Sequence, residues 1–579
     1  MRRFGLGDVQ GRTFDIAIVG GGITGASTAR EAALRGLSTV LVEKGDFASG
    51  TSSRSTKLLH GGVRYLERYE FRLVRESCRE RELMLKLAPH LAHVRPFIYL
   101  LYRGYPESMF LLNAGLTAYD AFSGSPLKRR HRMLGRAALL REEPYLNSSG
   151  LRGGGWYYDF LTDDARFVIE SLKGAVEAGA LAANYMDVTG LVMERGQVGG
   201  VEVTDRLTGA SGSIRARQVI NTTGPWTDQV RFLEPGVRDR LVRPTKGIHV
   251  VVRKQDFPLD HAVFLRSPRD NRVVWPIPAL DGDLVYIGTT DTEYDGPLDN
   301  VTATAEDVDY LLEAANFAIP DARLGLGHVV ATWAGLRPLI KPEGDLAASA
   351  ISRDHQVMMS PAGLLTITGG KMTTARLMGE HVVDAAVKVL ATDFGFHGVP
   401  RSRSATVPLS GGDAGARFAA RRRASDLSSV DPAIRQRWLD TYGGNAPALV
   451  DRVATDPEAG RDLGAHHLSL AEVRYAVEVE MARTVADFFA RRASIFFWAE
   501  DGGLSVADAV ASEMAALLDW PADERATQIA AYRDLVAANR FARRPDGTGG
   551  SGPVTPAPVP SNLTRPPRIL HRGFAPPPS

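Results

Sequence analysis

The chain has 579 residues, a length that predicts two or three domains because a single hydrophobic core rarely grows so large. Its 44% hydrophobic and 23% charged residues are typical of an ordinary globular protein. The formal net charge of +2 argues against a dedicated nucleic-acid-binding protein, and the single cysteine excludes a disulfide framework and a cysteine-ligated cluster.

A glycine-rich turn follows the first apolar run, residues 14–19, and has the pattern Gly20-x-Gly22-x-x-Gly25. In this pattern Gly20 forms a tight turn, Gly22 lets the backbone approach a pyrophosphate, and Gly25 lets the following helix pack close to the strand. A second apolar run ends at Glu43, which is placed to accept hydrogen bonds from a ribose diol. These features predict a βαβ unit that binds a dinucleotide whose 2′-hydroxyl is free.

A hydroxyl-rich segment comes next, with Thr51, Ser52 and Ser53. Hydroxyls and turn amides bind pyrophosphate or the edges of a cofactor ring. The segment continues into His60-Gly61-Gly62, where two glycines allow a flat cofactor to approach the backbone, and into Arg64-Tyr65.

Two later segments, 218–226 and 364–371, are predicted to be returning strands of the nucleotide domain, the second followed by a helix to about residue 390. Alternating runs at 273–277 and 284–288 indicate an antiparallel sheet. We therefore expect an α/β fold over residues 13–392: a Rossmann-like domain of discontinuous segments with an inserted antiparallel-sheet domain that binds substrate. The expected nucleotide-binding pieces are about 13–95, 160–235 and 330–392, and the expected sheet-domain pieces are about 96–159 and 236–329.

Residues 399–412 have the composition of a linker, and the pattern after them is helical. From Tyr475 to Phe489 apolar residues recur at three- and four-residue spacing. We expect a C-terminal helical domain over 413–543 and a disordered, proline-rich tail over 545–579.

The segment from Thr51 to Glu67 resembles the FAD-dependent glycerol-3-phosphate dehydrogenases of the aerobic, quinone-linked type. The resemblance extends in the same order through almost the whole chain from 14 to about 500. It is carried by further motifs at 222–226, 246–249, 287–291, 335–339, 352–354, 369–374, 483–484 and 491–492.

The resemblance implies FAD as the cofactor, and no metal site is predicted. The implied FAD-binding residues are Gly20, Gly22, Gly25, Glu43, Thr51, Ser52, Ser53, His60, Gly61, Gly62, Gly224, Trp226, Gly370, Lys371, Met372 and Thr373.

The resemblance also implies glycerol 3-phosphate as the substrate. Its dianionic phosphate suits the planar guanidinium groups of Arg64, Arg337 and Arg353, and Tyr65 is expected to bind phosphate or flavin or to pack beside Arg64.

A histidine is expected to take the substrate hydroxyl proton. We favour His249 and keep His60 as the alternative. Lys371 is expected to hold positive charge near flavin N1. Ile248 stands where a serine is common in the family. Its alkyl side chain cannot form the hydrogen bond that a serine hydroxyl there would offer to orient His249.

The implied reaction is oxidation of sn-glycerol 3-phosphate to dihydroxyacetone phosphate by hydride transfer to FAD, with membrane quinone as the electron acceptor, in glycerol and glycerophospholipid metabolism. An oxidase that reduces O₂ to H₂O₂ is the alternative, followed by a non-catalytic flavin-binding sensor. No nucleic-acid partner is expected, and the oligomeric state, a homodimer included, is left open. The first residues lack the apolar stretch of a signal peptide, and no run of about 18 apolar residues predicts a membrane-spanning helix. We expect a cytoplasmic protein that is peripheral on the cytoplasmic face of the membrane.

Overall fold

The first sheet is built around the strand that precedes the glycine-rich turn. In the computed structural model, which describes residues 1–280, 282–341 and 353–540, β1 (Thr13–Val19) lies between β10 (Ser211–Asn221) and β2 (Thr39–Val42) and is parallel to both. The strand order is β17-β18-β10-β1-β2-β7, with the β8–β9 hairpin beside β10. The other strands are β7 (Leu181–Ala183), β8 (Met186–Glu194), β9 (Gln197–Asp205), β17 (His355–Met359) and β18 (Leu365–Gly369).

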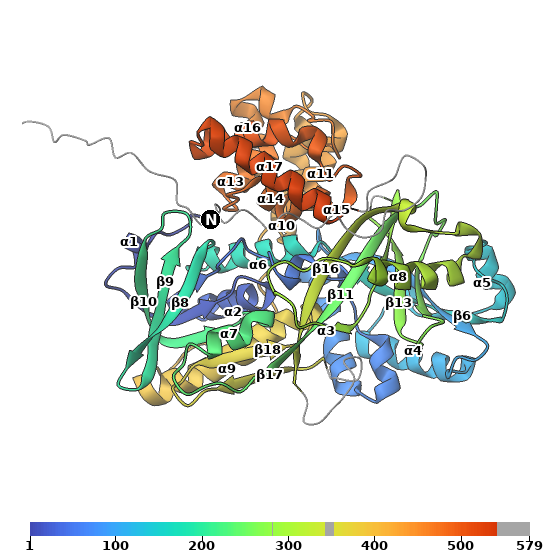
Figure 1. The fold of residues 1–579 in the computed structure, drawn as a ribbon, viewed down its shortest axis with the longest axis horizontal. Coiled ribbons are helices and arrows are strands. Elements are labelled where there is room, and N and C mark those ends of the chain that lie inside the picture. Colours follow the sequence, from blue (N-terminus) through green and yellow to red (C-terminus); the bar gives the residue numbers. More distant parts are fainter. Residues whose placement is uncertain (281, 342–352, 541–579) are drawn as a thin grey trace, which may run out of the picture.

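Both faces of β1 are covered, which explains its continuous apolar sequence. Ile16 and Ile18 pack in one hydrophobic cluster with the helices α2, α6 and α9, whereas Ala17 and Val19 pack in another with the β8–β9 hairpin. The helices are α2 (Ile23–Leu34), α6 (Asp164–Glu177) and α9 (Ala375–Phe394). Figure 1 shows this unit on the left of the molecule.

The second sheet, on the right of Figure 1, has the order β15-β11-β14-β13-β12-β4-β6-β3, with β16 beside β11 and β5 beside β6. All its pairings are antiparallel except that of β12 with β4. Its strands are β3 (Leu58–Leu59), β4 (His93–Tyr102), β5 (Arg132–Gly135), β6 (Leu151–Leu161), β11 (Val242–Arg253), β12 (Ala262–Arg266), β13 (Val273–Pro278), β14 (Leu284–Gly288), β15 (Thr292–Glu293) and β16 (Val329–Ile340).

Two helical layers cover this sheet. Ile248 and Val250 of β11 join a cluster with α5 (Arg136–Glu142) and α8 (Ala305–Ala318). Val251 faces the other way, into a cluster with α3 (Phe71–Leu87), α4 (Met109–Ser123) and helices of the C-terminal domain. The short helices α1 (Leu6–Val9) and α7 (Thr227–Arg231) belong to the periphery of the first sheet.

Two strands inside the predicted nucleotide-binding pieces belong to the second sheet. β16 begins at Val329 and pairs with β11, although it falls in the predicted piece 330–392. β3 pairs with β6, although it falls in the predicted piece 13–95. Both pairings join segments far apart in the chain, which local sequence patterns do not reveal.

The predicted linker 399–412 contains no helix or strand, yet it packs against the first domain. Leu409 is 5% exposed, its N–H donates to Leu87 O at 2.8 Å, and Arg30 Nη2 donates to Pro408 O at 3.0 Å. The predicted disordered tail, 545–579, lies outside the described residues.

The C-terminal domain is helical, as predicted, and lies above both sheets in Figure 1. Its helices are α10 (Ala414–Asp426), α11 (Pro432–Tyr442), α12 (Pro447–Thr455), α13 (Leu470–Glu478), α14 (Val485–Asp487), the π-helical turn η11 (Phe488–Arg492), α15 (Ile495–Trp498), α16 (Ala507–Leu518) and α17 (Ala522–Ala538).

The apolar spacing from Tyr475 to Phe489 runs through two helices with a break between them. α13 ends at Glu478, Met481 has φ +58°, and a new helix begins at the N-cap Thr484, whose Oγ1 accepts from Asp487 N at 3.0 Å. The break turns Glu480 toward the first domain, where it binds buried cations.

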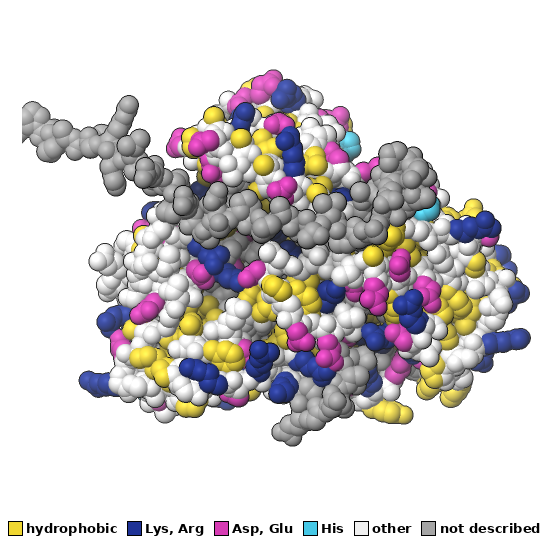
Figure 2. All heavy atoms as spheres, viewed as in Figure 1, with side chains coloured by type: hydrophobic (Ala, Val, Ile, Leu, Met, Phe, Trp, Pro, Cys, Tyr) yellow, Lys and Arg dark blue, Asp and Glu magenta, His cyan; other side chains and the backbone are white. Residues whose placement is uncertain are grey.

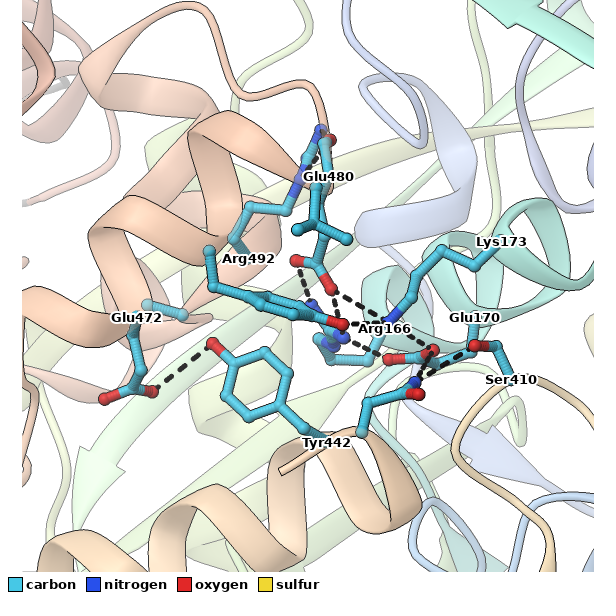
Figure 3. A network of polar contacts seen from close by, with 12 residues as sticks. Arg166, Glu170, Lys173, Ser410, Tyr442, Glu472, Glu480 and Arg492 are labelled. Carbon is cyan, nitrogen blue, oxygen red and sulfur yellow. Dashed lines mark hydrogen bonds and ion pairs between the residues drawn. The ribbon is translucent and has the colours of Figure 1, made fainter. Parts of the chain in front are cut away.

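Four side chains, which we name the interdomain cluster (Arg166, Glu170, Lys173 and Glu480), join the domains (Figure 3). Arg166 Nη1 donates to Glu480 Oε2 at 2.6 Å, and Lys173 Nζ lies 3.0 Å from Glu170 Oε2 and 3.4 Å from Glu480 Oε1. Each member is at most 3% exposed. Two cations and two carboxylates balance within the cluster.

The surface carries mixed charge. Figure 2 shows Lys and Arg side chains interspersed with Asp and Glu over the visible face, in line with a formal net charge of +2. Among the helices of the described residues, none is long and apolar enough to cross a membrane.

Candidate active site

A cavity of about 880 Å³ opens at the carboxyl ends of the parallel strands β1, β2 and β10. This is where open α/β sheets bind ligands. The predicted cofactor residues that line the cavity are Gly20, Gly22, Glu43, Thr51, Ser52, Gly224, Trp226, Gly370, Lys371 and Met372.

The glycine-rich turn has the geometry expected of a phosphate-binding loop. Gly20 has φ +106°, a value that favours glycine, and Gly22 is the N-cap of α2. A Cβ on Gly25 would lie 1.9 Å from Gly20 O, so only glycine lets α2 pack this close to the turn. Ser52 Oγ accepts from Ile23 N at 3.0 Å and thereby holds the hydroxyl-rich segment against the start of the helix.

Glu43 is fixed at the end of β2 by two backbone donors, Gly21 N at 2.7 Å and Gly45 N at 2.8 Å. Burial raises the pKa of this carboxyl, and the two N–H groups partly oppose the shift. Each carboxylate oxygen has more than one acceptor site, so the group keeps capacity for a ribose diol.

The remaining predicted cofactor residues do not line the cavity: Gly25, Ser53, His60, Gly61, Gly62 and Thr373. Close packing rather than contact with the cavity explains the glycine at position 61. A Cβ there would lie 2.4 Å from both Cys78 Sγ and Tyr119 Oη. Thr373 Oγ1 accepts from His60 N at 3.1 Å and ties the two segments together.

Positively charged side chains that do not themselves line the cavity gather beside Lys371, which does. Lys371 Nζ donates to Ser77 Oγ at 2.7 Å and lies 4.6 Å from the centre of the Tyr65 ring. Arg64 Nη2 donates to Tyr65 Oη at 3.1 Å. Burial raises the pKa of Tyr65, but the charges of Arg64, Lys371 and Arg353 outweigh it and lower the pKa to about 8.

Arg337 and Arg353 meet on one carboxylate. Arg337 Nη1 donates to Asp291 Oδ1 at 3.2 Å, and Arg353 Nη2 donates to Asp291 Oδ2 at 2.6 Å. Arg353 Nη1 is buried and has no hydrogen-bond partner among the described residues. Burial and the charges of Arg353 and Arg64 lower the pKa of Arg337 to about 10, although Asp291 opposes this shift.

We name Arg64, Arg337, Arg353 and Lys371 the cation cluster. In the described part of the chain, Asp291 is the carboxylate that forms ion pairs with its members. Because buried like charges repel, this excess of positive charge favours an anionic ligand. The structure therefore brings together the predicted substrate-binding residues, including Tyr65.

His249 lies on β11 and is 2% exposed. Its ring stacks on Trp333 with centroids 4.8 Å apart, and its Nε2 lies 3.0 Å from Thr56 Oγ1. Nδ1 is buried without a hydrogen-bond partner among the described residues. Burial, with the charges of Arg337 and Lys57, holds the pKa of His249 well below its usual value, so the imidazole is neutral at pH 7.

Ile248 does not affect the orientation of His249. Neighbouring strand residues point to opposite faces, and Ile248 is fully buried in the cluster on the far side of the sheet. Thr56 and Trp333 orient the imidazole instead, so the hydrogen bond missing from the sequence prediction is supplied from another segment.

His60 is half-buried near the cation cluster, with its ring centre 5.6 Å from that of Trp275. Burial and the charges of Lys371 and Arg64 hold its pKa well below the usual value. Neither His60 nor His249 lines the cavity itself.

Sequence reasoning missed four residues at this site: Arg54, Thr56, Asp291 and Arg491. Arg54 and Arg491 line the cavity, Thr56 orients His249, and Asp291 bridges two arginines. Arg54 and Thr56 lie within the hydroxyl-rich segment, and Asp291 and Arg491 lie in motifs that carry the family resemblance, so each had a local signal but no predicted partner.

Two family models match the chain. Residues 15–385 match FAD dependent oxidoreductase, and residues 402–525 match the C-terminal domain of alpha-glycerophosphate oxidase. The aerobic glycerol-3-phosphate dehydrogenase of Bacillus subtilis (strain 168) is 38% identical over 529 residues, which are 90% of this chain and 94% of the relative. The enzyme of the same name from Staphylococcus haemolyticus (strain JCSC1435) is 37% identical over 522 residues, 89% of this chain and 92% of the relative.

Solved structures with a similar fold include members of the same family. The glycerol-3-phosphate dehydrogenase from Bacillus halodurans complexed with FAD has a TM-score of 0.77 and 33% identity, covering 92% of this chain and 96% of that chain. The L-alpha-glycerophosphate oxidase from Mycoplasma pneumoniae, with TM-score 0.50 and 19% identity over 66% of this chain and 95% of that chain, shares the fold.

The residues present fit FAD. The Gly20–Gly25 turn, the anchored Glu43 and a cavity that continues to Lys371 provide for a dinucleotide with a ring system at its far end. With the family models and relatives above, the chain belongs to the FAD-dependent oxidoreductases, in the family of the aerobic glycerol-3-phosphate dehydrogenases.

Proposed function

We propose that this protein oxidises sn-glycerol 3-phosphate to dihydroxyacetone phosphate and passes the electrons to membrane quinone. The observation that carries the proposal is the excess positive charge of the cation cluster, whose member Lys371 lines the cofactor cavity. FAD, when bound, supplies the hydride acceptor. The protein residues bind and orient the substrate and take its proton.

Arg64, Arg337 and Arg353 bind the phosphate in this proposal. Guanidinium groups give paired, charge-assisted hydrogen bonds to phosphate oxygens, and Arg353 Nη1, a buried donor with no partner among the residues that the structure describes, is available for one of them. Lys371, which lines the cavity, holds positive charge next to the flavin ring. A neutral substrate analogue would leave these charges uncompensated.

His249 is the proposed base for the hydroxyl proton. It is neutral at pH 7, as a proton acceptor must be, and it lies on the same face of the second sheet as Arg337, four strand positions along the neighbouring β16. Between the two side chains, Gly247 pairs with Gly335, so the sheet presents no Cβ there. His60 remains the alternative base.

An exposed apolar region near the site supports a peripheral membrane location. Phe110 and Leu111 on α4 are 81% and 58% exposed, and Leu127 in the following turn is 78% exposed. Basic side chains, Lys128 to Arg130, follow directly. α4 contacts the turn η2 (Val63–Arg68), which carries Arg64, so the helix with Phe110 and Leu111 packs against an element of the substrate site. Apolar and basic residues together favour an anionic bilayer, the source of quinone.

The membrane proposal is tested with Phe110→Ser/Leu127→Ser in co-sedimentation with phosphatidylglycerol–phosphatidylcholine vesicles. We expect loss of vesicle binding and of turnover with vesicle-embedded quinone, whereas turnover with a water-soluble quinone analogue stays at the wild-type level. Phe418→Ser is the matched control, because Phe418 is 68% exposed but lies on α10 of the C-terminal domain. Wild-type vesicle binding by the double variant would remove this surface from the proposal.

The acceptor is tested by oxidation of glycerol 3-phosphate by purified protein with a quinone analogue or O₂ offered separately. We expect rapid turnover with the quinone analogue and slow peroxide formation with O₂. The oxidase of M. pneumoniae shares the fold, so the fold alone does not choose between acceptors. Fast, stoichiometric peroxide formation without quinone would assign the protein as an oxidase.

A further inference from the structure

The C-terminal domain supplies a guanidinium to the cofactor cavity. Arg491, in the turn η11, lines the same cavity as Gly22 and Ser52, which lie more than 400 positions earlier in the chain. Its Nε donates to Asp46 Oδ2 at 2.5 Å and its Nη2 to Asp487 Oδ1 at 2.6 Å. Within the described part of the chain, no hydrogen bond uses Nη1. Two carboxylates therefore fix the plane of the guanidinium and leave one nitrogen for a ligand.

Arg54 also places a guanidinium in this cavity. Its Nη1 is 3.5 Å from Ala334 O, a long contact, and it forms no ion pair with a carboxylate among the described residues. Arg54 is half-buried, and burial together with the charge of Arg491 lowers its pKa to about 10. Both guanidinium groups line one cavity, and like charges in one cavity favour an anion that completes the site.

The cofactor has its own anion close to this point. Gly22 is the position where the glycine-rich motif lets a pyrophosphate approach, and Ser52, two residues before Arg54, is bonded to the first turn of α2. We propose that Arg54 and Arg491 together bind the pyrophosphate of FAD. The C-terminal domain is then part of the cofactor site. Bound FAD contacts both Arg491 of that domain and the residues at the end of the first sheet, and so stabilises their association.

Arg492 provides a matched control. It donates to the same carboxylate, with Nη1 2.8 Å from Asp46 Oδ2 and Nη2 2.9 Å from Asp46 Oδ1. Its side chain is 0% exposed and does not line the cavity. Arg491 and Arg492 are thus neighbours on one carboxylate that differ in access to the cofactor.

The test measures the dissociation constant of FAD from the holoenzyme, from the free flavin collected by ultrafiltration across a dilution series at several salt concentrations. We expect Arg54→Gln and Arg491→Gln each to weaken FAD binding about 10- to 100-fold, the range for losing a charged hydrogen bond, and to reduce its salt dependence. Arg54→Lys keeps the charge and should recover much of the affinity. Arg492→Gln should lower the thermal midpoint with less than about threefold change in FAD affinity.

Two results would overturn the proposal: wild-type FAD affinity in Arg54→Gln, or equal losses of affinity in Arg491→Gln and Arg492→Gln, which would reduce Arg491 to a structural ion pair. If Arg491→Gln or Arg492→Gln fails to fold, Arg54→Gln and Arg54→Lys decide alone, because Arg54 has no carboxylate partner in the described part of the chain that its replacement would leave unpaired. Equal losses in those two variants would also contradict a charge-based contact.

Discussion

The interdomain cluster and the cation cluster are both buried, but their charges are arranged differently. The interdomain cluster pairs two cations with two carboxylates and closes on itself (Figure 3). Among the described residues, the ion pairs of the four cations in the cation cluster are with Asp291, and Lys371 of the cluster lines a cavity. A buried cluster with no net charge is stable without a ligand, whereas one with an excess of positive charge is stabilised by an anionic ligand.

The pKa shifts express the same difference. Burial alone would raise the pKa of Glu480, but Arg166 and Lys173 lower it to about 2, so this carboxylate is stabilised by its neighbours. The pKa of Arg337 is also lowered, to about 10, by burial and the other arginines. For a cation, a lower pKa means that the charged form is destabilised. Charges in the first cluster stabilise one another, and cations in the second destabilise one another until an anion binds.

The largest effect on stability is expected from breaking the balanced cluster. Glu480→Gln leaves Arg166 and Lys173 with one carboxylate, and we expect a loss of about 3–5 kcal/mol in the free energy of unfolding. The double variant Lys173→Met/Glu480→Gln restores balance and should recover part of this loss. Denaturant unfolding measures both, and additive losses in the double variant would refute a role for charge balance.

A large effect on rate is expected from His249→Asn. If His249 takes the substrate proton, flavin reduction should slow by about 10²- to 10⁴-fold while glycerol 3-phosphate still binds through the arginines. Anaerobic stopped-flow bleaching of the flavin across pH gives the rate and its lower inflection. A rate loss and missing inflection in His60→Asn alone would exchange the two assignments.

Arg353→Ala sharpens the comparison with Glu480→Gln. It removes one of four like charges, so we expect an unchanged or slightly raised thermal midpoint, with a loss of about 2–4 kcal/mol in transition-state stabilisation, read from kcat/KM. FAD content should remain at the wild-type level, because Arg353 does not line the cofactor cavity. A lower midpoint with unchanged kcat/KM would make Arg353 a structural ion-pair residue.

Tyr65 gives the smallest predicted effect. Below its pKa of about 8 the phenol is neutral and donates a hydrogen bond, and above it the phenolate adds negative charge beside the substrate phosphate. We expect kcat/KM to fall by about tenfold or less per pH unit above pH 8. Tyr65→Phe should lack this inflection, and an unchanged profile in that variant would assign the inflection to another group.

The sequence was sufficient where the chemistry is local. Gly20, Gly22, Gly25 and Glu43 belong to one βαβ unit, which their spacing predicted together with the apolar run before the glycines and the helical pattern after them. Arg64, Arg337, Arg353 and Lys371 were identified through the family resemblance, and the structure brings them together. The mutual arrangement of these four side chains depends on pairing between distant strands.

Other features depended on contacts that spacing does not encode. Arg491 lies in the cavity wall after a break in the helical pattern between Glu478 and Val485, which the apolar spacing does not show. Thr56 contacts His249 across 193 positions. The sheet to which β16 belongs was not evident either, since its partner β11 lies far away in sequence.

The central claim is that the phosphate of the substrate completes the cation cluster. It is tested most directly by anaerobic reduction of the holoenzyme flavin with glycerol 3-phosphate and with glycerol, in the wild type and in Arg337→Ala/Arg353→Ala. We predict that the wild type strongly prefers the phosphorylated substrate in kcat/KM and that the double variant loses at least about 100-fold of that preference. An equal preference in both proteins would contradict the claim.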